Sequence, residues 1–181
     1  MIIEDAEERV SYDRRTILLH WIVAGTIAFM WLLARFNMSF LQKGPLRLNL
    51  WSIHVLVGFC LAALVVARIV WRLTRGDRLP PAEHGVRHVL AVAVHYLLYL
   101  LMIVVVVLGL AHVSGFRLFG VLPFPTFWEK PVNHEIGELH GLAANIIAGL
   151  AVLHALAALY HHHVVKDRVL IRMNPRLRRR G

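Results

Sequence analysis

Four long apolar segments dominate the sequence and leave few folds open to it. They cover residues of about 16–35, 48–73, 88–112 and 136–165. Each reaches or approaches the ~20 residues that a helix needs to cross the hydrocarbon layer of a membrane. A single segment in hydrocarbon must satisfy its own backbone hydrogen bonds, so each segment should be a helix. The sequence therefore predicts an all-α integral membrane protein: a bundle of four transmembrane helices that forms a single domain over residues 1–181.

The overall composition excludes the usual water-soluble domain. The chain is 58% hydrophobic and only 17% charged, whereas soluble domains contain about 25% charged residues. A soluble helical protein would carry narrow apolar stripes instead of continuous apolar blocks. We therefore expect the lipid bilayer to be the main partner of this chain.

Lysine and arginine are distributed unevenly around the four segments. The formal net charge is +9, and the basic residues gather at the ends of the apolar segments. Fifteen of them flank the two termini and the second connection, and five flank the first and third connections. The positive-inside rule then places both termini in the cytoplasm. No basic fold motif accompanies the charge, so nucleic acid is not an expected partner.

Five histidines lie in the interior of the apolar segments, away from their ends, where ionisable residues are rare and indicate function. They are His20, His54, His95, His140 and His154. His140 and His154 are 14 residues apart. This spacing is about 21 Å along a helix and nearly four whole turns, so both side chains project from nearly the same helix face.

The order of the spans gives each of these two histidines a partner at its own depth. His20, near the start of the first span, shares the depth of His154, and His54 in the second span shares that of His140. Two imidazoles that face each other across a bundle can fill both axial positions of a haem iron. The sequence predicts two haems, one near each face of the membrane, held by the pairs His20/His154 and His54/His140.

The single cysteine, Cys60, restricts how a haem can be held. No Cys-x-x-Cys-His motif exists for covalent attachment, so each haem is expected to be haem b. Cys60 itself is expected to be a small core residue. Other uses of the histidines stay open, among them hydrogen bonds between helices, a proton pathway, and a zinc site. Zinc is the poorer match, because each depth offers no cysteine or carboxylate to complete a tetrahedral set.

Three further polar residues are candidates for contacts with a cofactor. His95 lies at the depth of His20 and His154 and could replace either as a ligand, or could hydrogen-bond a haem propionate or a quinone carbonyl. Arg68 and Arg72 are four residues apart and so share one helix face. They could pair with haem propionates, or they could serve only as positive-inside anchors.

The third connection, residues of about 114–133, is rich in aromatic residues and proline. It is expected to rest at the membrane interface as an aromatic belt, and a role as a lid over a cofactor is the alternative. The run His161-His162-His163 is expected at the opposite, cytoplasmic interface, with a metal site there as the alternative.

An ordered set of short motifs runs through nearly the whole chain. It comprises Leu19-His20-Trp21, Ile53-His54-Val55 with Gly58, Arg68 with Arg72, the third-span stretch from His95 to Leu100, Glu138-Leu139-His140, Leu153-His154, and the stretch from His161 to Asp167. In this order and spacing the chain resembles the bacterial cytochrome b-561 family of small four-helix di-haem proteins. The axial residues carried over from that family are His20, His54, His140 and His154.

The resemblance implies a function in the bacterial inner membrane. Members of the family exchange electrons with ubiquinone, and some resemble superoxide oxidases that take an electron from superoxide at the outer face. The implied function is electron transfer between an outer-face donor, a small molecule or a protein, and ubiquinone. The alternative is a haem-bearing membrane anchor of a multi-component dehydrogenase or hydrogenase.

Overall fold

The computed structural model describes residues 11–77, 79–81 and 85–177, and long helices account for most of them. The four longest helices are α1 (Arg14–Phe40), α2 (Pro45–Thr74), α3 (Gly85–His112) and α4 (Lys130–Tyr160). All four are long and apolar enough to cross a membrane, and the fourth span continues to Val165 through the π-helical turn η2 (His161–Val165). The predicted fold class, an all-α integral membrane protein with four spanning helices, is confirmed.

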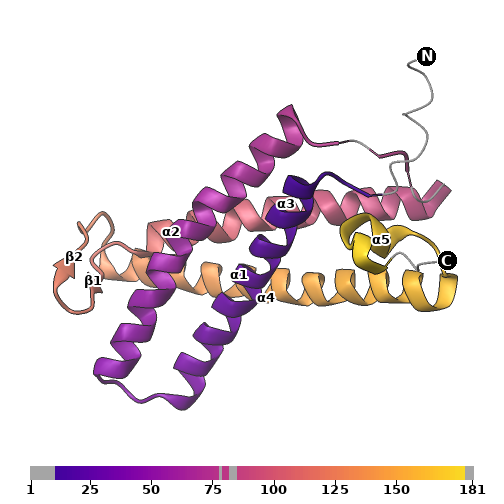
Figure 1. Cartoon of the computed structure of the whole chain (residues 1–181). Coiled ribbons are helices and arrows are strands. Elements are labelled where there is room, and N and C mark those ends of the chain that lie inside the picture. The colour runs from indigo at the N-terminus through magenta and orange to yellow at the C-terminus, as the bar shows by residue number, and fades with distance from the viewer. Residues whose placement is uncertain (1–10, 78, 82–84, 178–181) are drawn as a thin grey trace.

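The four helices form two antiparallel hairpins that cross obliquely (Figure 1). The helix α1 packs mainly against α2, and α3 packs mainly against α4. A small buried cluster joins the hairpins at the crossing; its members are Val23, Met30, Leu61, Val65, Met102 and Ile147. Most other apolar side chains point outward, as lipid-facing side chains do. Cys60 is one of these exposed residues, so its predicted place in the core is wrong.

The helices extend further than the apolar segments that predicted them. The first connection is only residues 41–44, and α4 begins at Lys130, inside the segment predicted as the third connection. Pro45 and Pro131 each stand in the first turn of a helix, where the fixed φ of proline favours helix initiation. Hydropathy marks where lipid ends, whereas a helix can continue into the polar interface until a capping residue or a turn stops it.

Both ends of the described chain lie at the same end of the bundle, with the α2–α3 connection (Figure 1). We call this the terminal end. The backbone N–H of Tyr12 donates to the carbonyl of Arg172 (3.0 Å). The Trp21 indole donates to the carbonyl of Met173 (2.9 Å), and the Arg172 guanidinium donates to the carbonyl of Pro80 (2.7 Å). These bonds hold the short helices α5 (Val169–Met173) and η3 (Pro175–Leu177) near the start of α1.

The basic residues on which the predicted orientation rests therefore share one end of the molecule in the described parts of the chain. Five of those residues fall outside the described residues: Arg9, Arg78, Arg178, Arg179 and Arg180.

Asp13 ties the start of α1 to the end of α2. Its carboxylate accepts hydrogen bonds from the backbone N–H and hydroxyl of Thr16, from the Trp71 indole (3.2 Å) and from the backbone N–H of Asp77 (3.4 Å). Burial by itself would raise the pKa of Asp13, but these donors favour the ionised carboxylate and hold its pKa below the usual value. The side chain is also the N-cap of α1.

The opposite end of the bundle carries the α1–α2 turn and a short antiparallel hairpin, β1 (Arg117–Leu118) with β2 (Leu122–Pro123); we call it the hairpin end. The sequence did not predict these strands. Phe119 and Gly120 both have positive φ at the turn, a conformation that glycine adopts freely. The hairpin rests on α2, because the N–H of Phe119 donates to the Ser52 hydroxyl (2.8 Å) and Phe124 stacks on Phe59.

Candidate functional site

Two pairs of histidines face each other between helices, one pair toward each end of the bundle. His20 of α1 and His154 of α4 lie toward the terminal end, with ring centroids 6.4 Å apart. His54 of α2 and His140 of α4 lie toward the hairpin end, with ring centroids 6.2 Å apart. All four side chains are half-buried. The structure thus brings together the residues that helix periodicity and span order had matched.

The separation within each pair suits a metal ion between the rings. A metal bound to an imidazole nitrogen stands about 2 Å from it, so two rings on opposite sides of one metal have centroids about 6 Å apart. The planes within the two pairs are inclined by 70° and 87°. In the described parts of the chain, no three His, Cys, Asp or Glu side chains gather into a metal-binding cluster. Pairs of imidazoles are therefore the unit of this site, which is the donor set of a bis-histidine haem.

His140 is held by the neighbouring helix. Its Nδ1 lies 2.9 Å from the carbonyl oxygen of Val105 on α3. A carbonyl can only accept, so Nδ1 carries the ring proton and Nε2 keeps its lone pair for a metal. Ligating histidines in metalloproteins are commonly oriented by such a bond. His54, opposite, has a buried Nδ1 without a hydrogen bond of normal geometry to any described residue.

His20 lies against an arginine. The Nη2 of Arg68 donates to the Nδ1 of His20 (3.1 Å), and the guanidinium lies over the Tyr99 ring at 5.5 Å. The other terminal nitrogen, Nη1, is buried and has no hydrogen-bond partner among the described residues. A guanidinium with a buried, unused donor is a strong site for a carboxylate. The donor set at this end therefore fits a porphyrin that carries propionate groups.

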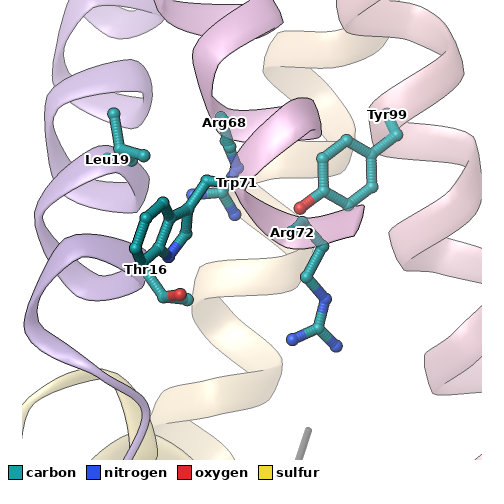
Figure 2. A pocket seen from close by; sticks show the side chains of 6 residues that line it. All are labelled: Thr16, Leu19, Arg68, Trp71, Arg72 and Tyr99. Atoms are coloured by element: carbon teal, nitrogen blue, oxygen red, sulfur yellow. The ribbon is translucent and has the colours of Figure 1, made fainter. Parts of the chain in front are cut away.

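A small pocket opens beside Arg68 at the terminal end (Figure 2). Its lining comes from three helices: Thr16, Leu19, Arg68, Trp71, Arg72 and Tyr99. Arg72 has less free donor capacity than Arg68. Its Nη1 already donates to the carbonyl of Asp77 (2.9 Å), and its guanidinium lies 5.4 Å from the Tyr12 ring. Arg68 is consequently the better placed of the two arginines for a propionate.

His95 lies close to the pair at the terminal end but differs from it. Its ring centroid is 5.2 Å from that of His154, closer than two rings on opposite sides of one iron would stand, and its side chain is exposed. Its Nδ1 bonds to the carbonyl of Ala91 within the same helix (2.6 Å). This geometry favours His20 over His95 as the partner of His154.

The histidine run after α4 forms the π-helical turn η2 at the terminal end. The Nδ1 of His161 contacts a carboxylate oxygen of Asp167, whose other oxygen accepts from the N–H of Val169 (2.9 Å). The run therefore closes the end of the fourth span and begins the turn toward α5.

Sequence reasoning missed one histidine. His112, at the last position of α3, bonds through Nδ1 to the carbonyl of Asn133 on α4 (2.9 Å). The signal that could have found it is a repeated spacing, since Gly109 precedes His112 and Gly137 precedes His140 by three residues each.

Four membrane helices that present paired imidazoles at two depths have the architecture of a membrane-embedded haem protein. The comparison with known families identifies which family of membrane haem proteins this is. The chain belongs to the prokaryotic cytochrome b561 family, whose sequence model matches residues 11–176.

Curated relatives match along almost their whole length. The chain is 30% identical over 168 residues to cytochrome b562 of Cereibacter sphaeroides, covering 90% of this chain and 94% of the relative. It is 29% identical over 180 residues to the probable superoxide oxidase CybB of Yersinia pestis, covering 93% and 98%. It is 27% identical over 172 residues to cytochrome b561 homolog 1 of Escherichia coli K12, covering 91% and 97%.

These matches confirm the family that the motifs indicated. The chain is a bacterial membrane protein that binds haem b and transfers electrons.

Proposed function

We propose that this protein is a di-haem b electron carrier that passes electrons from an outer-face donor to ubiquinone. The observation that carries the proposal is the presence of two imidazole pairs, 6.4 Å and 6.2 Å apart, toward opposite ends of the bundle. His20 and His154 are the proposed axial ligands of one haem, and His54 and His140 those of the other. When bound, each haem supplies a one-electron redox centre whose potential the protein sets by ligation, charge and burial.

The proposed orientation puts the terminal end in the cytoplasm and the hairpin end outside the bacterial inner membrane. The pair His20/His154 then faces the cytoplasm, and His54/His140 faces the outer side. The whole chain acts as one domain, because α1, α2 and α4 supply the paired histidines and α3 holds His140 through the Val105 carbonyl.

Arg68 is the proposed propionate partner of the cytoplasmic haem. For Nε2 of His20 to bind iron, its Nδ1 must carry the ring proton, and Arg68 can then no longer donate to that nitrogen. The guanidinium is free to turn to a carboxylate, which would satisfy the buried Nη1 as well. Arg72 is the second candidate, limited by its bond to the Asp77 carbonyl.

His95 is the proposed contact for a quinone carbonyl or a haem propionate. Its exposed ring stands beside His154, and Ala91 holds its Nδ1, so Nε2 is the nitrogen that can meet a ligand. Quinone reduction consumes protons, and an imidazole near the membrane interface is a suitable donor.

Superoxide is the proposed outer donor. One curated relative is named a probable superoxide oxidase. The first and third connections with their flanks carry five basic residues against Glu129, Glu135 and Glu138. This modest positive balance would attract an anionic donor.

A rapid-mixing experiment on the purified oxidised protein tests this function. Superoxide should reduce the haems in the visible spectrum, and added ubiquinone should then reoxidise them and form ubiquinol. Superoxide dismutase added first should abolish both signals. If superoxide left the haems oxidised while a co-purifying soluble subunit reduced them, the anchor function would replace this proposal.

A further inference from the structure

The interface between α3 and α4 contains the same three-residue arrangement twice, once on each helix. On α3 it consists of the Val105 carbonyl, then Gly109, then His112, at spacings of four and three residues. On α4 the Asn133 carbonyl, Gly137 and His140 have the same spacings. Each histidine reaches across to the carbonyl of the other helix, with Nδ1 to oxygen distances of 2.9 Å in both cases.

The two glycines lie directly beneath these imidazole rings. A Cβ atom added at Gly109 would stand 2.9 Å from Cε1 and 3.2 Å from Nδ1 of His140. A Cβ added at Gly137 would stand 2.6 Å from Cε1 of His112. Either ring would have to move, and movement of the His140 ring disturbs its bond to the Val105 carbonyl.

Helix geometry explains why glycine occupies this position. In an α-helix the N–H of residue i donates to the carbonyl of residue i−4, so Gly109 donates to the carbonyl of Val105. That carbonyl has a second lone pair, which His140 uses. A side chain at position 109 would project beside the shared carbonyl and obstruct the incoming imidazole. Glycine therefore keeps the helix hydrogen bond and leaves room for the bond between helices.

We propose that Gly109 is the positioning residue of the outer haem site. It allows the Val105 carbonyl to fix the tautomer and direction of His140, so that Nε2 points toward the iron. This inference rests on the proposed function, because it takes His140 as an axial ligand. The matching arrangement around His112 and Gly137 holds an imidazole that is not a proposed ligand, so the chain supplies its own control.

The first test compares Gly109→Ala with Gly137→Ala in the purified holoprotein. Loss of the bond that orients a metal ligand typically weakens binding about 10- to 100-fold. In Gly109→Ala we expect haem retention at the outer site to fall by about that factor, and the potential of any outer haem that is retained to shift. The cytoplasmic haem, at His20 and His154, should be unchanged. Gly137→Ala should retain both haems and both potentials, measured by redox titration of the visible spectrum. Equal effects of the two substitutions would overturn the proposal.

A second test separates positioning from general packing. In His140→Gly, added imidazole can serve as a ligand that is not attached to α4. Adding Gly109→Ala to this variant should cause no further loss of outer haem, because a free imidazole can shift away from the added methyl group and still bind the iron. An undiminished loss would show that Gly109 acts through helix packing, which contradicts the proposal. In every variant, the spectrum of the cytoplasmic haem shows whether the bundle has folded.

A wrong axial ligand and a wrong role of Gly109 give different experimental results. If His140→Ala without imidazole kept both haems, the ligand assignment in the proposed function would be wrong. If His140→Ala lost the outer haem while Gly109→Ala kept it with unchanged potential, only the role of Gly109 would be wrong.

Discussion

The four paired histidines differ in what surrounds the nitrogen that does not face its partner ring. His140 has a backbone carbonyl at Nδ1, His20 has a guanidinium, and the Nδ1 of His54 is buried without a normal hydrogen bond. With haem bound, the Nδ1 of His140 still donates to its carbonyl, which adds to the basicity of the imidazole. Arg68 can then no longer donate to His20 and contributes its positive charge near that haem. The two haem sites are therefore expected to differ in reduction potential, because different groups lie beside their histidines.

His54→Ala should remove one haem and keep the other. The substitution leaves His140 without a facing imidazole, while His20 and His154 at the terminal end keep their 6.4 Å spacing. We expect the visible spectrum of the reduced variant to lose about half of its haem absorbance, since one bis-imidazole pair of two is lost. His134→Ala is a matched control, because this exposed histidine of α4 lies outside both pairs. Retention of the full absorbance by His54→Ala would refute the assignment of the outer pair.

At the scale of elements, polar side chains at helix ends fix how the helices and the hairpin meet. Ser52 is completely buried on α2; its hydroxyl donates to the Leu48 carbonyl and accepts from the N–H of Phe119. Asp13 performs the corresponding function at the terminal end, where it connects α1 with α2 and with the segment that follows α2.

Ser52→Ala should loosen the hairpin from α2. It leaves the Phe119 N–H without its acceptor, at a cost of about 1–3 kcal/mol for a buried group. We expect a lower midpoint of thermal unfolding in detergent and faster proteolysis between β1 and β2. Thr26→Val removes a similar bond from a hydroxyl to a helix carbonyl without orphaning any N–H, and it should change stability by no more than about 0.5 kcal/mol. Equal stability losses in the two variants would contradict this role of Ser52.

Asp13 should make the stability of the protein depend on acid pH. Because the folded state holds the pKa of Asp13 below its usual value of about 4, its contribution is complete above that value. The contribution is lost as pH falls through the lower pKa of the folded state. Asp13→Asn keeps an N-cap acceptor but cannot ionise in this range. Thermal unfolding at a series of acid pH values should therefore show a weaker pH dependence in Asp13→Asn than in the wild type; identical profiles would rule out this role of Asp13.

At the scale of the whole molecule, the sequence predicted the helices and the histidine pairs because both follow from regular geometry. Apolar length marks a span, and the 14-residue interval between His140 and His154 fixes their faces and depths. The contacts of Arg68 with His20, and of His112 with Asn133, depend on the angle and position at which two helices cross. The periodicity of a single helix does not specify that crossing. The β1–β2 hairpin was missed for the same reason, since its bond to Ser52 joins residues 67 positions apart.

The central claim is that two imidazole pairs, each drawn from separate helices, hold two haems in one chain. The most direct measurement is the ratio of haem b to polypeptide, obtained from a pyridine haemochrome assay and quantitative amino-acid analysis of protein produced in haem-sufficient cells. We expect two haems per chain. A ratio of one would eliminate one of the two pairs as a haem site, and a chain free of haem would contradict both.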